Sequence, residues 1–404
     1  MDVRIEKSTA HGKVSAPPSK SFAHRLIICA ALAGNGSEVL GLAGSEDILA
    51  TLDCVEACFG TRYEKNGENI VFEESDAYGA PKGALMCRES GSTMRFFIPL
   101  CLVKDTECKL YGSEKLLTRP LTVYEDICRE QGIEFSHKGD HIRVRGPLRS
   151  GRFTVPGNIS SQFISGLMFA LPLLKGDSEI CILPPLDSKP YIDITIKALE
   201  RFGVKAEWKD ELTLSIKGDQ KYIPASERVE GDYSNAAFLS ALDLLGGDVE
   251  IDGLCEDSAQ GDKAYIEQFK LLSNGTPEIN ISDCPDLAPI LMSVAAVKNG
   301  VKLTGTARLK IKESDRGVVM AQELAKFGVP VFVGENEIIV EGGHFRAPTE
   351  ALCGHNDHRI VMSMAVLCTL TGGTITGAQA VKKSYPDFFE VITELGIEVF
   401  KSDN

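Results

Sequence analysis

The sequence predicts a mixed α/β protein with two domains, each made of three repeated units in which sheets cover buried helices. Two helix patterns alternate along its 404 residues. One pattern is apolar throughout after a polar start, as in "SSQFISGLMFALPLL", and the other is amphipathic and ends at glycine, as in "MAQELAKFG". A helix that is apolar all round must be buried, whereas an amphipathic helix keeps one face in solvent. The alternation therefore indicates buried helices enclosed by other elements.

The spacing of these patterns indicates six copies of one unit. The polar starts of the apolar patterns recur at intervals of 71, 69, 73, 52 and 71 residues, at Ser21, Ser92, Ser161, Ser234, Asp286 and Asp357. The glycines that end the amphipathic patterns follow these starts by 39 to 42 residues, at Gly60, Gly132, Gly203, Gly275, Gly328 and Gly396. A period near 70 exceeds the usual solenoid repeats, so each unit should contain two helices and several strands.

The chain is long enough for two domains of three units each. The shortened fourth interval and the stretch "YIPASERVEGD" at 222–232 place the junction near residue 229. We therefore expect one domain over residues 14–229 and the other over residues 1–13 and 230–404.

Composition limits the classes of partner. The net charge of −14 argues against a general nucleic-acid binder or an anionic membrane surface as partner, so any cationic site must be local. The twelve cysteines include no CxxC pair, which favours reduced thiols of a cytoplasmic protein. The start "MDVRIEKSTAHGK" has no apolar signal region, and no apolar run approaches membrane-spanning length. These features predict a cytoplasmic location without nucleic-acid or membrane partners.

The polar starts of the apolar helices are candidate anion sites, because a helix N-terminus offers free N–H groups and a positive dipole end. Several starts carry an arginine, namely Arg25, Arg95 and Arg359. The guanidinium fork suits carboxylates and phosphates. Serine and aspartate are also ordinary helix caps, so a single start is not evidence of a site.

The segment "KIKESDRG" at 310–317 concentrates charge at the start of an amphipathic helix, with Lys310, Lys312, Glu313, Asp315 and Arg316 in eight positions. Cations beside carboxylates suit the binding of small polyanions together with proton transfer.

Other chemistries find less support. His355, Asp357 and His358 could suggest a metal site, but no recognisable third-ligand pattern accompanies them. The chain has no GxxxxGK[ST] loop, no strand–GxGxxG–helix context and no GxSxG elbow. We therefore expect neither a metal nor a nucleotide cofactor.

Nine motifs occur in the order found in one family: "SAPPSKSFAHR", "LTRPL", "SSQF", "SKPYIDIT", "VEGDYS", "DCPDLAP", "KESDR", "NDHR" and "KKSYPDFF". From Ser15 to Phe389 the chain resembles the 5-enolpyruvylshikimate-3-phosphate synthases. The resemblance implies the two-domain enolpyruvyl-transferase fold with the active site in the cleft between the domains. It also implies transfer of the enolpyruvyl group from phosphoenolpyruvate to the 5-hydroxyl of shikimate 3-phosphate with release of phosphate. A monomer without cofactor, inhibited by glyphosate, is expected.

The resemblance also implies roles for individual residues. Asp286 is expected to be the base for the 5-hydroxyl, Glu313 the acid and base for the methylene carbon, and Lys20 a residue that reaches both substrates. The residues expected to bind shikimate 3-phosphate are Lys20, Ser21, Arg25, Ser160, Ser161, Gln162, Ser188, Asp286 and Lys312. Those expected to bind phosphoenolpyruvate are Lys20, Gly91, Arg119, Gln162, Arg316, Arg359 and Lys383. Asp315 is expected to orient a neighbouring cation.

Two positions depart from the family pattern. Glu89 in "CRESGSTMRF" stands where the family commonly has asparagine, and Arg308 stands where better-known members have an asparagine that contacts shikimate phosphate. A carboxylate at position 89 should repel phosphoenolpyruvate unless a cation pairs with it. Neither change removes an expected catalytic group.

Two other functions remain as alternatives. One is the related UDP-N-acetylglucosamine enolpyruvyl transferase, whose reactive cysteine has no counterpart in the loop "GSEKLLTRP". The other is a catalytically silent small-molecule binding protein, against which the presence of Lys20, Asp286, Glu313 and Arg359 argues.

Overall fold

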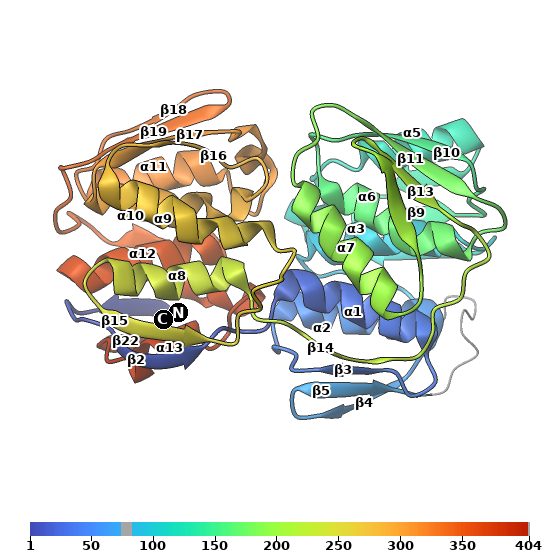
Figure 1. Cartoon of the computed structure of the whole chain (residues 1–404), viewed down its shortest axis with the longest axis horizontal. Coiled ribbons are helices and arrows are strands. Elements are labelled where there is room, and N and C mark those ends of the chain that lie inside the picture. The colour runs from blue at the N-terminus through green and yellow to red at the C-terminus, as the bar shows by residue number, and fades with distance from the viewer. Residues whose placement is uncertain (74–82, 403–404) are drawn as a thin grey trace. The chain divides into compact units, whose positions relative to one another are not determined.

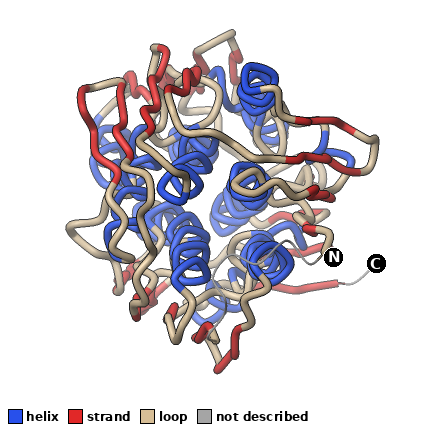
Figure 2. The backbone as a smooth tube through the Cα atoms, turned by 90° about the vertical axis from the view of Figure 1, so that its right-hand side faces the viewer, coloured by secondary structure: helices blue, strands red, loops and turns tan. Residues whose placement is uncertain are grey.

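A computed structural model describes residues 1–73 and 83–402. The chain divides into two compact units, which are described separately: unit 1 contains Met1–Pro17 and Glu230–Asn404, and unit 2 contains Pro18–Val229. Residues 14–17 lie with unit 1 because strand β2 (His11–Ser15) pairs in parallel with β15 (Asp248–Asp252). Figure 1 shows the elements of both units, and Figure 2 shows strands lying outside helices.

The described residues of unit 2 include three buried helices, as the apolar patterns predicted. They are α1 (Lys20–Ala33), α3 (Gly91–Cys101) and α6 (Ser161–Ala170). Each begins at a serine cap whose side-chain oxygen accepts a backbone N–H of the first turn. The capping residues are Ser19, Ser90 and Ser160. Each cap satisfies one N–H group, while the other N–H groups of the first turn have no intrahelical partner.

The amphipathic helices of unit 2 alternate with the buried ones. They are α2 (Glu46–Phe59), α5 (Thr122–Gln131) and α7 (Lys189–Arg201), with a short extra helix α4 (Glu114–Leu117) and the 3₁₀ turn η1 (Leu171–Leu173). Gly60 and Gly132 end α2 and α5 with φ angles of 68° and 69°, a left-handed conformation that glycine adopts without steric cost.

The three sheets of unit 2 share one topology. Their strand orders are β14-β3-β5-β4, β6-β7-β9-β8 and β10-β11-β13-β12. In each sheet the first pair is parallel and the other two pairs are antiparallel. The strands are β3 (Glu38–Leu40), β4 (Tyr63–Asn66), β5 (Asn69–Phe72), β6 (Leu85–Met86), β7 (Glu107–Tyr111), β8 (Glu134–His137), β9 (His141–Arg145), β10 (Arg152–Pro156), β11 (Ser178–Leu183), β12 (Ala206–Asp210), β13 (Thr213–Ile216) and β14 (Ser226–Arg228).

Unit 1 repeats this alternation around one hydrophobic core. Its buried helices are α8 (Tyr233–Leu244), α10 (Ala288–Val297) and α12 (His358–Thr371), and its second series is α9 (Tyr265–Asn274), α11 (Arg316–Lys326) and α13 (Phe388–Glu394). The 3₁₀ turns are η2 (Gly261–Ala264), η3 (Pro285–Leu287), η4 (Ala307–Ile311) and η5 (Ala378–Lys383).

Two four-stranded sheets of unit 1, β20-β21-β1-β22 and β16-β17-β19-β18, have the topology seen in unit 2. Within residues 1–73 and 83–402, the remaining sheet contains only β15 and β2, which explains the short interval of 52 residues between the fourth and fifth helix starts. The strands are β1 (Asp2–Ile5), β16 (Glu278–Asn280), β17 (Gly300–Thr304), β18 (Val331–Val333), β19 (Glu337–Glu341), β20 (Leu352–Cys353), β21 (Gly373–Thr376) and β22 (Val399–Ser402).

Among the residues that the structure describes, no helix is long and apolar enough to cross a membrane.

Candidate active site

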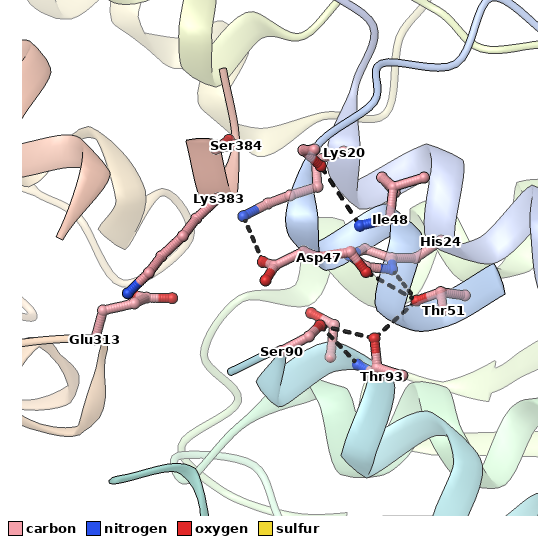
Figure 3. Close-up of polar contacts among 12 residues, drawn as sticks. Lys20, His24, Asp47, Ile48, Thr51, Ser90, Thr93, Glu313, Lys383 and Ser384 are labelled. Atoms are coloured by element: carbon pink, nitrogen blue, oxygen red, sulfur yellow. Dashed lines mark hydrogen bonds and ion pairs between the residues drawn. The ribbon is translucent and has the colours of Figure 1, made fainter. Parts of the chain in front are cut away.

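The predicted site residues form one set in each unit. In unit 2, Lys20 is the first residue of α1, and its Nζ lies 3.0 Å from Oδ2 of Asp47 on α2 (Figure 3). Both side chains are only 15% exposed, so this ion pair is largely shielded from water. Sequence reasoning missed Asp47, because a carboxylate at the start of an amphipathic helix usually only complements the helix dipole.

Arg25 lies inside unit 2, with 2% of its surface exposed. Its Nε donates to Thr195 Oγ1 at 2.7 Å, and its Nη2 donates to Ser165 Oγ at 3.3 Å and to the carbonyl of Tyr191 at 3.1 Å. Burial lowers the pKa of Arg25 to about 10. In this structure Arg25 therefore ties α1 to α6 and α7, and its contact with shikimate 3-phosphate stays a prediction.

Gly91 begins α3 beside a group of polar side chains. A methyl group added at Gly91 would lie 2.8 Å from Arg119 Nη1 and 3.2 Å from Arg95 Nη1. Gln162 accepts from Arg95 Nη1 through Oε1 at 2.7 Å and donates through Nε2 to Ser92 Oγ at 2.8 Å. The structure thus brings together the predicted Gly91, Arg119 and Gln162.

Within the described residues, the buried Nε of Arg119 has no hydrogen-bond partner. A buried donor without a partner costs free energy, so an acceptor on a ligand would stabilise it. This observation favours an anion beside Gly91.

A buried chain of hydrogen bonds supports the start of α3 (Figure 3). His24 Nδ1 lies 2.7 Å from Thr51 Oγ1, Thr51 Oγ1 lies 2.7 Å from Thr93 Oγ1, and Thr93 Oγ1 donates to Ser90 Oγ at 2.7 Å. Burial, aided by the charges of Lys20 and Arg25, lowers the pKa of His24 well below its usual range. The neutral imidazole therefore joins α1 to α2 and α3.

The predicted phosphate-binding hydroxyls also lie at helix starts. Ser160 and Ser161 are 7% and 4% exposed at the start of α6, and Ser188 is 1% exposed at the start of α7. Ser188 has a φ angle of 59°, which is uncommon for a residue other than glycine. Backbone N–H groups and hydroxyls at two helix starts suit an anionic ligand.

In unit 1, three cations converge on one carboxylate. Asp286 Oδ1 lies 3.1 Å from Lys312 Nζ and 2.7 Å from Arg316 Nη1, and Oδ2 lies 3.1 Å from Arg359 Nη2. Burial opposes ionisation of Asp286, but Arg359, Lys312 and Arg316 together hold its pKa well below the usual range. Asp286 is therefore ionised in this structure.

Arg316 is 1% exposed and also binds two other carboxylates. Its Nε donates to Asp357 Oδ2 at 2.9 Å, and its Nη2 donates to Glu313 Oε2 at 2.6 Å. Burial opposes the charge of Arg316, but Asp357, Glu313 and Asp286 together raise its pKa above the ordinary value. The fully buried Asp357 was predicted as the start of a buried helix and weighed as a metal ligand, but its ion pair with Arg316 was not predicted.

Lys383 completes the predicted set in unit 1. Its Nζ donates to the carbonyl of Asn356 at 2.8 Å and points toward the carboxyl group of Glu313 (Figure 3). Ion pairs join Asp286, Lys312, Glu313, Arg316 and Arg359, and Lys383 contacts the backbone next to Asp357, the other partner of Arg316. The described residues contain no group of three side chains that could hold a metal ion.

Asp315 lies in the charged segment, and Arg308 and Glu89 are the two departures from the family pattern. Asp315 accepts the backbone N–H of Val318 at 3.2 Å, so it caps α11 rather than orienting a cation as predicted. Arg308 is 8% exposed. Burial of Lys312, together with the charges of Arg316 and Arg308, lowers the pKa of Lys312. Glu89, the other departure from the family pattern, is half-buried next to the cap of α3.

Asp262, on η2, is a buried carboxylate that sequence reasoning missed. It is 5% exposed, and burial together with the negative charge of Asp286 raises its pKa to about 6, although Arg359 acts in the opposite direction. A buried aspartate has no sequence pattern that distinguishes it from an exposed one, so only the structure reveals it.

Asp262→Asn is expected to stabilise unit 1 at neutral pH. Because the folded pKa of about 6 exceeds the ordinary 3.8, the folded protein loses stability relative to the unfolded chain as pH rises through this range. A rise of about two pKa units corresponds to about 3 kcal/mol. The free energy of unfolding of the variant should therefore exceed that of the unmodified protein by up to about this amount above pH 6, and should equal it below about pH 4. Urea unfolding at about pH 4 and pH 7 measures the difference. An equal gain in the free energy of unfolding at both pH values would contradict the raised pKa of Asp262.

The comparisons with known proteins agree with the ordered motifs. A family model described as EPSP synthase (3-phosphoshikimate 1-carboxyvinyltransferase) matches residues 5–392. A protein of Clostridium perfringens named 3-phosphoshikimate 1-carboxyvinyltransferase is 40% identical over 423 residues, with 98% of each chain covered. One of the same name from Clostridium acetobutylicum is 39% identical over 419 residues, again with 98% of each chain covered.

The fold agrees as well. A solved structure of EPSP synthase from Acinetobacter baumannii matches with a TM-score of 0.82 and 23% identity, and the match covers 100% of both chains. This likeness confirms the predicted fold class. With the family model spanning nearly the whole chain, the chain belongs to the EPSP synthase (3-phosphoshikimate 1-carboxyvinyltransferase) family.

Proposed function

We propose that this protein is a 3-phosphoshikimate 1-carboxyvinyltransferase of the shikimate pathway. It transfers the enolpyruvyl group of phosphoenolpyruvate to the 5-hydroxyl of shikimate 3-phosphate and releases phosphate. Family membership and the names of relatives about 40% identical support the reaction. We also propose that the enzyme acts as a monomer in the cytoplasm.

The observation that carries this proposal is the convergence of Lys312, Arg316 and Arg359 on Asp286. All three cations contact this one carboxylate, and Arg316 also pairs with Glu313 and Asp357. Two guanidinium forks among them suit the carboxylate and phosphate groups of phosphoenolpyruvate. Asp286 is thus the group that a bound anion would displace from its partners.

We assign the chemical steps to these side chains. The 5-hydroxyl oxygen attacks the substituted alkene carbon of phosphoenolpyruvate while its proton passes to Asp286. Glu313 protonates the methylene carbon, which becomes a methyl group. In the elimination, Glu313 takes back a methyl proton, the double bond re-forms, and phosphate leaves with the electrons of the C–O bond. The proton on Asp286 leaves with the phosphate.

The low pKa of Asp286 makes it a weak base in this structure, because its cations stabilise the ionised form. Anionic groups of phosphoenolpyruvate that draw Arg316 and Arg359 away from Asp286 would raise its proton affinity. The same anions would raise the proton affinity of Glu313, whose partner is also Arg316. Substrate binding therefore prepares both groups for proton transfer.

The set in unit 2 is proposed to act on the same two substrates. Lys20 reaches both of them, Gly91, Arg119 and Gln162 serve phosphoenolpyruvate, and serine hydroxyls serve shikimate 3-phosphate. The hydroxyls and their neighbours are Ser21, Arg25, Ser160, Ser161, Gln162 and Ser188. Helix starts and the buried Nε of Arg119 support these assignments.

Phosphate release tests the proposed function. Phosphoenolpyruvate is supplied with shikimate 3-phosphate, with UDP-N-acetylglucosamine, or with neither. The proposal expects release only with shikimate 3-phosphate, together with a product that carries a vinyl ether at the 5-position. Release with the nucleotide sugar would instead favour the related transferase, and no release would favour a binding protein.

Gly91→Ala is expected to weaken the binding of phosphoenolpyruvate selectively. The added methyl group would lie 2.8 Å from Arg119 Nη1 and would displace the Arg119 side chain. The KM for phosphoenolpyruvate should rise several-fold, while the Kd for shikimate 3-phosphate stays within about twofold. Glyphosate, proposed to compete with phosphoenolpyruvate, should lose at least as much affinity. A change in both substrates by the same factor would contradict the placement of phosphoenolpyruvate beside Gly91.

A further inference from the structure

The turn that leads into α12 is strained. His355 and Asn356 have φ angles of 49° and 54°, in the left-handed region that residues other than glycine rarely adopt. Two such residues in succession persist only where the surrounding structure holds them. Strain of this kind points to a constraint at the turn.

This turn contacts three of the cations in unit 1. The carbonyl of Asn356 accepts from Lys383 Nζ at 2.8 Å. The next residue, Asp357, binds Arg316 Nε at 2.9 Å through Oδ2 and caps α12 by accepting the backbone N–H of Arg359 at 3.0 Å through Oδ1. The position of this turn therefore sets the positions of Lys383, Arg316 and Arg359 together.

One buried carboxylate accepts hydrogen bonds from the turn and from the segment before it. Glu323, on α11, is 1% exposed. Its Oε1 accepts from His355 Nε2 at 2.8 Å, its Oε2 accepts the backbone N–H of Cys353 at 2.9 Å, and Lys326 Nζ lies 3.0 Å from Oε2. Because a carboxylate only accepts hydrogen bonds, Nε2 of His355 carries the hydrogen. Two of the three donors come from the segment that enters the turn.

We infer that Glu323, acting through His355, is a positioning residue that holds the turn 355–357 where Lys383, Arg316 and Arg359 can bind one phosphoenolpyruvate molecule. Neither Glu323 nor His355 belongs to the predicted substrate-binding set. The inference rests on the proposed function, because it takes these three cations as the phosphoenolpyruvate set. It explains why a strained turn and a buried carboxylate occur together.

His355→Leu tests the inference by removing the hydrogen bond to Glu323 while filling a similar volume. The KM for phosphoenolpyruvate should rise about tenfold or more, since small displacements of binding groups are costly. The Kd for shikimate 3-phosphate, measured by calorimetry, should change less than about twofold. His355→Gln, whose amide can still donate to Glu323, should recover most of the affinity for phosphoenolpyruvate.

A second variant and a control guard against a general effect on folding. Glu323→Gln keeps the shape but cannot accept from every donor, so it should also raise the KM for phosphoenolpyruvate selectively. Lys326→Met removes the third donor to Glu323, along with a hydrogen bond to the carbonyl of Ala351, and changes no residue of the turn. It should leave the KM for phosphoenolpyruvate and the Kd for shikimate 3-phosphate within about twofold of the unmodified protein. Thermal unfolding of each variant is recorded in parallel.

The outcomes separate this inference from the proposed function. If the unmodified protein releases no phosphate with shikimate 3-phosphate, the proposed function fails. If phosphate is released, the positioning role is wrong in either of two cases. In one, His355→Leu and Glu323→Gln leave the KM for phosphoenolpyruvate unchanged. In the other, they raise this KM and the Kd for shikimate 3-phosphate by the same factor. A raised KM for phosphoenolpyruvate in His355→Leu that is largely restored in His355→Gln supports the role.

Discussion

Glu313→Gln is expected to reduce turnover by about 10²–10⁴-fold, the usual contribution of a positioned acid or base. Arg316 would keep its ion pairs with Asp357 and Asp286, so the substrate-binding cations should stay in place. Binding of both substrates should therefore remain near normal. The variant should also suppress incorporation of solvent deuterium into the vinyl carbon of the product, because that carbon exchanges its proton with Glu313 in the proposed steps.

Asp315→Asn provides the matched control, since it removes a charge two residues away. Asp315 caps α11, and asparagine caps helices about as well as aspartate, so turnover and deuterium exchange should stay near those of the unmodified protein. Ordinary turnover and exchange in Glu313→Gln would show that Glu313 is not the carbon acid. Lys20 would then be the better candidate.

Arg359→Ala is expected to cost about 2–5 kcal/mol in phosphoenolpyruvate binding, the usual loss when one partner of a shielded charge pair is removed. This corresponds to a roughly 30-fold to several-thousand-fold weaker affinity. Asp286 would keep Lys312 and Arg316 as partners, so its carboxylate would stay ionised. The Kd for shikimate 3-phosphate should change far less.

Arg359→Lys refines this test, because lysine keeps the charge but not the planar fork. An intermediate loss is expected if the guanidinium binds phosphoenolpyruvate through two donors. Steady-state KM for phosphoenolpyruvate and calorimetric Kd for shikimate 3-phosphate measure the effects separately. Equal losses for the two substrates would contradict the assignment of Arg359 to phosphoenolpyruvate.

Much of the fold could be predicted from sequence because it repeats. The spacing from Ser21 to Asp357 located the six buried helices in the described part of the chain, and glycines such as Gly60 and Gly132 marked the ends of amphipathic ones. The two-stranded sheet of β15 and β2 could not be predicted, since its strands lie more than 230 residues apart in sequence. Only the short interval before Asp286 indicated that one repeat was incomplete.

The site was predicted less completely, and for a physical reason. Cations at helix starts, such as Lys20 and Arg359, follow from local sequence together with the family resemblance. Their carboxylate partners do not, because Asp47, Asp262 and Asp357 owe their roles to burial and to contacts across the fold. Asp315 shows the converse error, since a carboxylate among cations turned out to be a helix cap.

The threading of the two units sets an order of events during synthesis. Unit 2 is one continuous segment, Pro18–Val229, whereas unit 1 joins Met1–Pro17 to Glu230–Asn404. Strand β1 lies between β21 and β22, and both partners come from the last part of the chain. Because chains emerge from the ribosome N-terminus first and fold domain by domain, unit 2 can fold while unit 1 still lacks most of its core. Strand β1 therefore cannot form its sheet until residues 373–402, which supply β21 and β22, have been synthesised.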